Sequence, residues 1–262
     1  MALAVQATAQ SFLTNGLVAY YPFNGNANDA VGTNNGTVYG ATLTADRFGE
    51  PNRAYLFDGS SKILASDQAV PKGNGSRTMS LWVNCHTMTT NKAYAIPFSY
   101  GTHITSQANW INVFTGDDGS GRPAGSVLFD FYDSGPLTTN LVNLNAWQHL
   151  VCSLESPSSA RVYINGRLAG AASVSANTTS SGNMIIGSYN GPDAAGLGVI
   201  GEIDDVRIYN RAVSAFEVQQ LYAYESTPPQ SFLTNGLVAY YPFNGNANDA
   251  AGTNDGTLNG TD

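Results

Sequence analysis

The chain has 262 residues, of which 42% are apolar and only 11% are charged, and its formal net charge is −8. An apolar fraction of this size supports a sizeable core, whereas the acidic balance argues against nucleic acid and anionic membranes as partners. No run of eighteen apolar residues occurs, so the sequence predicts no membrane span. The chain contains only three lysines, a composition that suits an extracellular protein exposed to proteases.

The N-terminal segment, residues 1–11, reads MALAVQATAQS and joins an apolar stretch to small residues of the A-x-A kind. This pattern resembles the end of a signal peptide, so it predicts a secreted, extracellular or cell-surface protein. The positively charged start of a complete signal peptide is missing, and a flexible leader without a targeting role is the alternative.

Strand signals dominate the chain that follows, as short runs of β-branched and aromatic residues between turns rich in Gly, Asn and Asp. Pro22 limits the first strand to a sheet edge or a strand end, and Asn165-Gly166 predicts a tight hairpin. The predicted strands are Gly16–Phe23, Ala54–Phe57, Lys62–Ala65, Met79–Cys85, Ala93–Ser99, Trp110–Phe114, Ser126–Tyr132, Trp147–Leu154, Ala160–Ile164, Met184–Ser188 and Glu202–Tyr209. Strands of this number and spacing indicate an all-β fold, a two-sheet antiparallel β-sandwich or jelly roll.

One short helix is predicted near the C-terminal end of this domain. Ser214 and Glu217 form a capping box at its start, and Pro228-Pro229 ends the run. The expected apolar stripe consists of Phe216, Val218, Leu221 and Tyr222. These signals divide the chain into a leader over 1–11, a jelly-roll domain over 12–225, a linker over 226–230 and a further segment over 231–262.

The segment after the linker repeats the start of the domain. Residues 10–30 and 230–250 carry the same twenty-one letters, QSFLTNGLVAYYPFNGNANDA, and GTNNGT at 32–37 corresponds to GTNDGT at 252–257. The chain therefore holds one full unit and the first strands of a second, which is the pattern of a tandem-repeat protein. A segment this short does not bury a core of its own.

The two cysteines, Cys85 and Cys152, both lie on predicted strands. They form a disulfide if their strands are neighbours in an oxidising compartment, and they are buried free thiols otherwise. The Cα separation that decides between these alternatives is not contained in the sequence.

A set of segments matches one known family in order along the chain. These segments are GLVAYYPFNGNANDAVG from Gly16, AYLFDGSSKI from Ala54, MSLWVN from Met79, WQHLVCSLE from Trp147, ARVYINGRLAG from Ala160, MIIGSYN from Met184 and GEIDDVRIYNRAVSAFEVQQLY from Gly201. Together they resemble the LamG-like, concanavalin A-like jelly-roll family of bacterial extracellular proteins. The resemblance covers residues 16–224 and implies two stacked antiparallel sheets whose first and last strands lie close together.

The resemblance also implies a structural Ca²⁺ ion where the first and last strands meet. Carried over onto this sequence, the side-chain ligands are Asp29 and Asp204, with Asn24 or Asn28 as further oxygen donors. Ca²⁺ takes six to eight oxygen ligands, and such Asn and Asp side chains are among those it prefers.

Strand alternation puts Asp204 on the face of Val206 and Ile208, which we expect to be buried. A buried carboxylate needs a partner, and this requirement favours the calcium interpretation. The alternative is Asx-turn capping over residues 24–29 together with a hydrogen-bonded, buried Asp204.

No catalytic residues are predicted. Jelly-roll glycosidases use paired carboxylates in a pattern such as E-x-D-x-x-E, which this sequence lacks, and its nearest set is Glu202, Asp204 and Asp205. The H-E-x-x-H, G-x-S-x-G and Walker sequences are also absent. The sequence therefore predicts a protein that is not an enzyme.

Aromatic residues beside Asn or Asp side chains are the usual platforms for sugars. Trp110 and Tyr189, with the neighbouring Asn190, are the predicted ligand-binding residues, and Tyr94, Tyr100 and Tyr132 also lie on or near loops. The alternative is that these aromatic side chains belong to the core, because a sandwich of this size buries several of them.

These features favour a non-catalytic adhesion or recognition domain, stabilised by calcium, which binds a glycan or another cell-surface ligand. The alternative is a structural subunit of an extracellular fibre. In that case residues 231–250 add as a strand to a neighbouring subunit, and this contact builds a homo-polymer because it does not close on itself.

Overall fold

The computed structural model describes residues 13–86, 94–116, 119, 121–132, 134–189, 197–228, 236–241 and 246–257. Contacts divide the chain into two compact units, residues 1–223 and residues 224–262. The predicted leader over residues 1–11 lies outside the described residues. No helix among the described residues is long and apolar enough to cross a bilayer.

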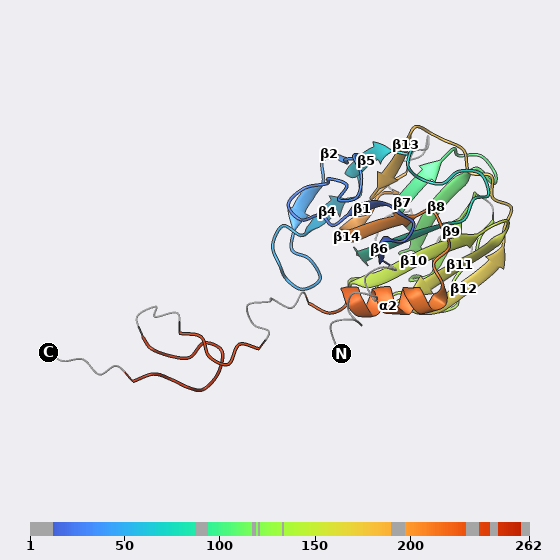
Figure 1. Ribbon diagram of the computed structural model, residues 1–262. Coiled ribbons are helices and arrows are strands. Elements are labelled where there is room, and N and C mark those ends of the chain that lie inside the picture. The colour runs from blue at the N-terminus through green and yellow to red at the C-terminus, as the bar shows by residue number, and fades with distance from the viewer. Residues whose placement is uncertain are drawn as a thin grey trace. The chain divides into compact units, whose positions relative to one another are not determined.

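The first unit is built from two stacked antiparallel sheets (Figure 1). The eight-stranded sheet has the order β12-β11-β10-β6-β14-β4-β3, and β1 also pairs with β14. Its strands are β1 Leu17–Tyr21, β3 Thr42–Thr44, β4 Ala54–Asp58, β6 Arg77–Cys85, β10 Gln148–Glu155, β11 Ser159–Ile164, β12 Arg167–Ser173 and β14 Ile200–Tyr209.

The six-stranded sheet has the order β2-β5-β13-β7-β8-β9. Its strands are β2 Thr37–Tyr39, β5 Lys62–Ser66, β7 Tyr94–Gly101, β8 Ala108–Phe114, β9 Val127–Asp130 and β13 Asn183–Ile186. The predicted all-β, two-sheet antiparallel sandwich with a short helix near its C-terminal end is therefore confirmed.

The main core lies between the two sheets. Alternate residues of each strand point inward, as the two-residue period of a strand requires. Leu81 and Leu150 enter this core from the eight-stranded sheet, and Phe98 and Phe129 enter it from the six-stranded sheet, all of them fully buried.

The first and last strands of the domain are neighbours, as the family resemblance implied. Leu17 lies opposite Tyr209, Tyr20 opposite Arg207 and Tyr21 opposite Val206 in the β1–β14 ladder. β1 ends at Tyr21, directly before Pro22, because proline has no N–H group for the ladder.

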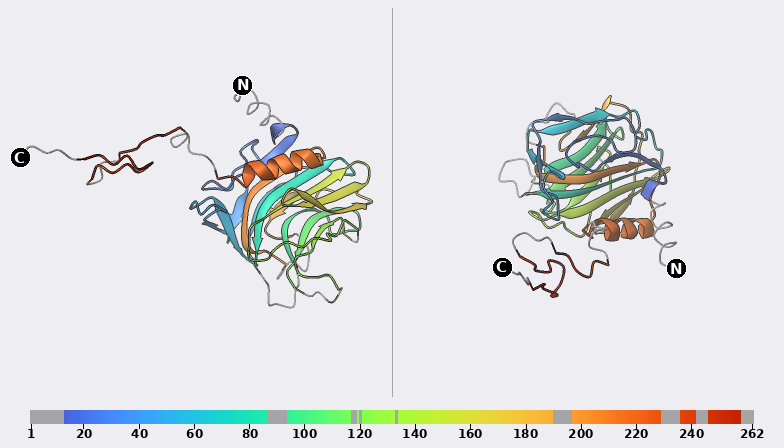
Figure 2. Two further views of the ribbon diagram at one scale, coloured as in Figure 1. Left: turned by 90° about the horizontal axis from the view of Figure 1, so that it is seen from below. Right: turned by 60° about the vertical axis from the view of Figure 1, so that its left-hand side comes forward.

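The helix α2, Ala215–Glu225, covers part of the outer face of the eight-stranded sheet (Figure 2). The predicted capping box is present, since Ser214 N donates to Glu217 Oε2 over 2.8 Å and Glu217 N donates to Ser214 Oγ over 3.2 Å. Val218 is buried with Tyr209 in a cluster on this face. Phe216 is 67% exposed, so its predicted place in the apolar stripe is wrong.

The predicted hairpin between β11 and β12 is also confirmed. Asn165 and Gly166 have φ values of 50° and 78°, the left-handed conformations that a two-residue turn of this type requires. Three strands lie outside the predicted ranges: β12, which was implied only as the second strand of this hairpin, and the short strands β2 and β3. Every residue of β2 is exposed, so it carries no apolar alternation for a sequence to reveal.

The two cysteines are free, buried thiols. Cys85 lies opposite Gly201 and Cys152 lies opposite Met79, so each thiol pairs across its ladder with a residue that is not a cysteine. Burial raises the pKa of the Cys85 thiol to about 12 and also raises the pKa of Cys152. These thiols are therefore unreactive parts of the core.

Candidate functional site

The outer face of the six-stranded sheet carries a group of buried polar and aromatic side chains on β8 and β9. Ile111 and Val113 of β8 point into the main core, so the alternating residues Trp110 and Asn112 lie on the outer face. By the same alternation, Phe129 of β9 points inward and Asp130 outward. Trp110 lies directly opposite Asp130 in the β8–β9 ladder.

Asn112 and Asp130 form a polar pair within this face. Asn112 Nδ2 donates to Asp130 Oδ2 over 2.9 Å, and the two residues are 4% and 9% exposed. The other amide atom, Asn112 Oδ1, is buried and accepts no hydrogen bond from any residue that the structure describes. Because a buried oxygen without a donor is costly, a ligand or water molecule that reaches this atom after a movement of the covering side chains would gain a favourable hydrogen bond.

An aromatic cluster, formed by His103, Trp110, Tyr132 and Tyr189, lies next to this polar pair. The His103 ring centroid is 5.2 Å from that of Trp110, 4.4 Å from that of Tyr132 and 5.9 Å from that of Tyr189. Trp110 and Tyr189 are buried at its base, while His103 and Tyr132 are half-buried and reach solvent. The cluster therefore presents aromatic surface beside an amide and a carboxylate.

The loop between β7 and β8 positions His103. Gln107 Oε1 accepts hydrogen bonds from Thr102 Oγ1 over 2.9 Å and from Thr179 Oγ1 over 3.0 Å. The backbone N–H of Thr179 also donates to the Gln107 carbonyl oxygen over 3.3 Å. These bonds fasten both ends of the loop, residues 102–107, to the segment that precedes β13.

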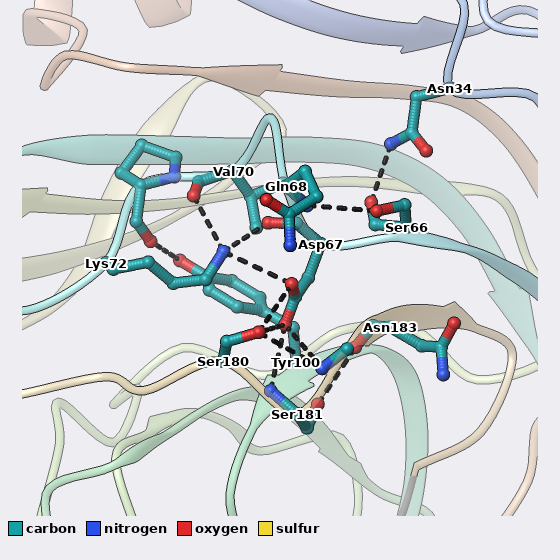
Figure 3. A network of polar contacts seen from close by, with 12 residues as sticks. Asn34, Ser66, Asp67, Gln68, Val70, Lys72, Tyr100, Ser180, Ser181 and Asn183 are labelled. Atoms are coloured by element: carbon teal, nitrogen blue, oxygen red, sulfur yellow. Dashed lines mark hydrogen bonds and ion pairs between the residues drawn. The ribbon is translucent and has the colours of Figure 1, made fainter.

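That segment is itself held by a buried carboxylate. Figure 3 shows Asp67 facing Ser180, Ser181 and the Lys72 ammonium group. Asp67 is fully buried and accepts hydrogen bonds from Ser180 Oγ over 2.8 Å, Ser181 N over 2.9 Å and Gly182 N over 3.1 Å. Burial lowers the pKa of Lys72, and the Asp67 carboxylate offsets part of this effect. A buried, satisfied network of this kind makes the end of the sandwich near His103 rigid.

The structure brings together two of the three predicted ligand-binding residues. The ring centroids of Trp110 and Tyr189 are 5.3 Å apart, although both rings are more deeply buried than a ligand platform predicts. Asn190 lies outside the described residues. Sequence reasoning missed Asn112 and Asp130, because the pairing of β8 with β9 that places Asp130 beside Trp110 is a tertiary contact.

The predicted calcium ligand Asp29 uses its carboxylate for backbone hydrogen bonds. Its Oδ1 accepts from Tyr20 N over 3.1 Å and from Val31 N over 3.0 Å, and its Oδ2 accepts from Asn34 N over 3.4 Å. This arrangement is the Asx-type capping that the sequence left as the alternative.

Asp204, the second predicted ligand, is buried as expected but lies on the other face of its sheet. Asp205 adopts a φ of 48°, and the register of β14 against β6 shifts between Asp204 and Arg207. This bulge reverses the alternation, so Val206 and Ile208 enter the main core while Asp204 points outward. The predicted common face of Asp204, Val206 and Ile208 is therefore wrong.

On this outer face, Arg47 joins the two adjacent carboxylates. Its guanidinium lies 2.6 Å from Asp204 Oδ2 and 2.9 Å from Asp205 Oδ2, and it also stacks over the Trp82 ring at 4.6 Å. Burial and the neighbouring Asp205 raise the pKa of Asp204, and Arg47 opposes this rise. The arrangement is a buried ion-pair network.

The four predicted calcium ligands do not meet at one point. Asn24 Oδ1 accepts from Arg53 over 2.9 Å, and Asn28 is exposed and donates its backbone N–H to Asn26 Oδ1. No three acidic, His or Cys side chains converge on a common metal position among the described residues. With Asp29 capping backbone N–H groups and Asp204 paired with Arg47, the residues present do not fit one shared Ca²⁺ ion.

Several solved structures share this fold. Domain 4 of AbnA, a GH43 extracellular arabinanase from Geobacillus stearothermophilus, in complex with arabinotriose, is 23% identical, with a TM-score of 0.60 over 79% of this chain and 98% of that one. The binding domain of Paraclostridial Mosquitocidal Protein 1 is 16% identical, with a TM-score of 0.61 over 80% of this chain and 52% of that one.

A structure of botulinum neurotoxin type C, whose cell entry depends on interaction with two ganglioside molecules, is 13% identical. Its TM-score is 0.60 over 82% of this chain and 53% of that one. The chain thus spans about half the length of the two toxin structures. These similarities show the fold.

The sequence matches no curated protein significantly. Residues 57–219 match the family model of the concanavalin A-like lectin/glucanases superfamily. This match spans more than half of the chain and includes β8, β9 and β14 of the sandwich. The chain therefore belongs to the concanavalin A-like lectin/glucanases superfamily.

Proposed function

We propose that this domain is a non-catalytic, extracellular carbohydrate-binding domain. Its site is the outer face of β8 and β9, where the aromatic cluster borders the Asn112–Asp130 pair. In this assignment a sugar ring packs on the half-buried rings of His103 and Tyr132, and its hydroxyl groups bond the polar pair.

One observation carries the proposal, the buried amide oxygen of Asn112. Asn112 Oδ1 accepts no hydrogen bond from the described residues, while Nδ2 of the same amide is bonded to Asp130. A sugar hydroxyl is a donor that satisfies this oxygen, and the adjoining aromatic surface suits the apolar face of a pyranose or furanose ring. Ligand sites that are mostly apolar typically contain a few precisely placed polar groups of this kind, which fix the orientation of the ligand.

The solved relatives support this class of ligand. The arabinanase domain was solved with arabinotriose, and the neurotoxin interacts with gangliosides, which carry sugar headgroups. The arabinanase is an extracellular protein, which agrees with the lysine-poor composition of this chain. Arabino-oligosaccharides and ganglioside headgroups are therefore the first probes for this domain.

We assign a binding role without catalysis because the sequence lacks the paired carboxylates that glycosidases of this fold use. Glycosidases of this fold place two carboxyl groups across a cleft, and the sequence lacks the E-x-D-x-x-E pattern that supplies them. Asp204 and Asp205, the nearest match, are engaged by Arg47.

A glycan array that includes arabino-oligosaccharides and ganglioside headgroups tests the proposal with matched variants. Asn112→Ala removes the oxygen at the site, and Asn84→Ala removes a comparable amide oxygen from β6 in the other sheet. We expect the unchanged chain and the Asn84→Ala variant to bind the same glycan, and Asn112→Ala to bind it about tenfold more weakly, the effect of one hydrogen bond.

Two results would contradict the proposal. The first is an unchanged chain that binds no glycan on the array. The second is equal binding by Asn112→Ala and Asn84→Ala, which would place the sugar elsewhere.

A further inference from the structure

The first strand of the domain belongs to a local structure that we call the β1 unit, residues 16–37. Its central residue is Asp29, whose carboxylate accepts hydrogen bonds from three backbone N–H groups of the unit. The Asp29 N–H donates to Asn35 Oδ1 over 3.0 Å, and Tyr21 OH donates to the Asn34 carbonyl oxygen over 2.6 Å. All of these bonds lie within the unit itself.

The second compact unit contains the same local structure. Asp249 Oδ1 accepts from Tyr240 N over 2.9 Å and from Ala251 N over 3.0 Å, and Asp249 Oδ2 accepts from Asn254 N over 3.3 Å. Asp249 N donates to Asp255 Oδ1 over 2.9 Å. We call the described residues 236–241 and 246–257 the repeated β1 unit.

Within the loops of the two units, the burial of Asp and Ala at corresponding positions also agrees. Asp249 and Ala247 are 6% and 7% exposed, compared with 6% and 4% for Asp29 and Ala27. Tyr241 OH donates to the Asn254 carbonyl oxygen over 2.6 Å, as Tyr21 does to Asn34. The repeated β1 unit therefore has the same internal hydrogen bonds, although its residues 237–241 are not assigned to a strand.

The two units differ in their strands. Residues 17–21 form β1 on β14, and Ala19 and Tyr21 are fully buried. The identical residues 237–241 belong to no sheet among the described residues, and Leu237, Val238 and Tyr240 are 40%, 84% and 53% exposed. An exposed apolar segment that carries the sequence of an edge strand is suited to pair with a sheet edge.

Side-chain contacts, in addition to the backbone ladder with β14, hold β1 in its place. Tyr20 OH donates to Asp205 Oδ1, and Arg207 stacks over the Tyr20 ring at 3.6 Å. Asn24 Oδ1 accepts from Arg53, and the Gly25 N–H donates to the Asn52 carbonyl oxygen over 2.8 Å. The repeated unit carries the same residues at the corresponding positions of its sequence, including Tyr240 for Tyr20.

We propose that the repeated β1 unit takes the β1 place on β14 of a second copy of this chain. In this pairing Tyr240 lies opposite Arg207 of the second copy, and Tyr241 lies opposite its Val206, as Tyr20 and Tyr21 do in β1. Main-chain hydrogen bonds supply the affinity and the alternating side chains supply the register. Such a contact is head to tail, so it links copies into an open chain.

The two β1 units differ only at Val31/Ala251 and Asn35/Asp255, so the exchange of one for the other keeps every residue of the β1 strand, 17–21. At low protein concentration the chain's own β1 unit, called the resident unit, therefore occupies the place on β14, because its covalent attachment gives it a high effective concentration. Linked copies form when the resident unit is weakened or when the protein is concentrated. A test of the pairing must consequently open the β1 place in one partner.

The test uses full-length chains in two roles. The acceptor carries Ala19→Asp and Ala239→Asp, which put a charge at the buried core position of β1 and at its counterpart, so neither unit of this chain can occupy the place. The donor is the unchanged chain, and the matched control donor carries Ala239→Asp alone. The acceptor is tagged, mixed with each donor, and analysed by size-exclusion chromatography with light scattering.

We expect the unchanged donor to form a complex with the acceptor and the Ala239→Asp donor to form none. Equal behaviour of the two donors would overturn the proposal. If the acceptor does not fold, a second acceptor with Tyr20→Ala and Tyr240→Ala removes the side-chain contacts to Asp205 and Arg207. The same difference between donors is expected there, and its absence would equally overturn the proposal. Glycan binding is not part of this readout, so the two proposals fail separately.

Discussion

At the scale of single residues, the buried histidine on the outer face of the eight-stranded sheet gives the domain a defined pH response. His149 is fully buried, its Nε2 is 2.8 Å from Ser80 Oγ, and its ring packs against those of Trp82 and Tyr222, with centroids 5.2 Å and 5.9 Å away. Burial, together with the nearby charges of Arg47 and Arg207, lowers the pKa of His149 from 6.5 to about 3.

This shift predicts lost stability in mild acid. Between pH 6.5 and about 3 the unfolded chain binds a proton at His149 that the folded chain does not, so the free energy of unfolding falls as the pH falls. We expect His149→Gln to flatten this fall in urea unfolding over the same range, whereas His86→Gln, at a half-exposed position, keeps it. An unchanged slope in His149→Gln would contradict the assignment.

The alternation of inward and outward side chains was predicted correctly along β8 but not across the bulge in β14. The period of two holds along β8 and places Trp110 and Asn112 on one face. It fails at Asp205, whose left-handed conformation inserts an extra residue into β14 and turns Asp204 to the other face. A bulge depends on the pairing with the partner strand, so the local sequence of β14 did not predict it.

At the scale of elements, the β1 unit and the repeated β1 unit offer a comparison of two sequences that differ at only two positions, Val31/Ala251 and Asn35/Asp255. Asp29→Ala leaves three backbone N–H groups of the domain without their acceptor, and we expect it to lower the free energy of unfolding by about 1–3 kcal/mol. Asp249→Ala removes bonds that stay within residues 240–254, so the unfolding of the domain should not change. Chemical denaturation of both variants measures the difference, and equal losses would refute it.

Elements determined by residues that are close in sequence were predictable, whereas elements that depend on pairing with a distant strand were not. The capping box of α2 and the Asn165-Gly166 turn are set by neighbouring residues, and both form as predicted. β2 and β3 pair with β5 and β4. Each has only 3 residues, too few to show an alternation of apolar and polar positions, although Thr, Val and Tyr favour strands. The same holds for the candidate site, since Trp110 was predicted but its partner Asp130 comes from another strand.

At the scale of the whole molecule, the domain is held together by a core between two sheets and by hydrogen bonds at the β1–β14 junction. Asp29 caps backbone N–H groups there, and Asp204 pairs with Arg47, so neither carboxylate is free for a metal ion at this junction. Calcium binding stays a prediction of the sequence, and the described residues hold no group of three or more Asp, Glu, His or Cys side chains placed for a metal ion.

Because both carboxylates at the β1–β14 junction are already engaged, we predict that the stability of the domain does not depend on calcium. We expect the same melting temperature in excess Ca²⁺ and after treatment with EDTA, because a ligand stabilises a fold only when it binds the folded state. A melting temperature that falls in EDTA and recovers with Ca²⁺ would reveal a site formed by other residues.

The central claim, that the outer face of β8 and β9 binds sugar, is tested most directly by NMR titration with a glycan selected on the array. We expect the side-chain amide of Asn112 and the indole N–H of Trp110 to shift on saturation, while the Trp147 indole, outside the proposed site, stays unchanged. Shifts confined to other surfaces of the domain would contradict this claim.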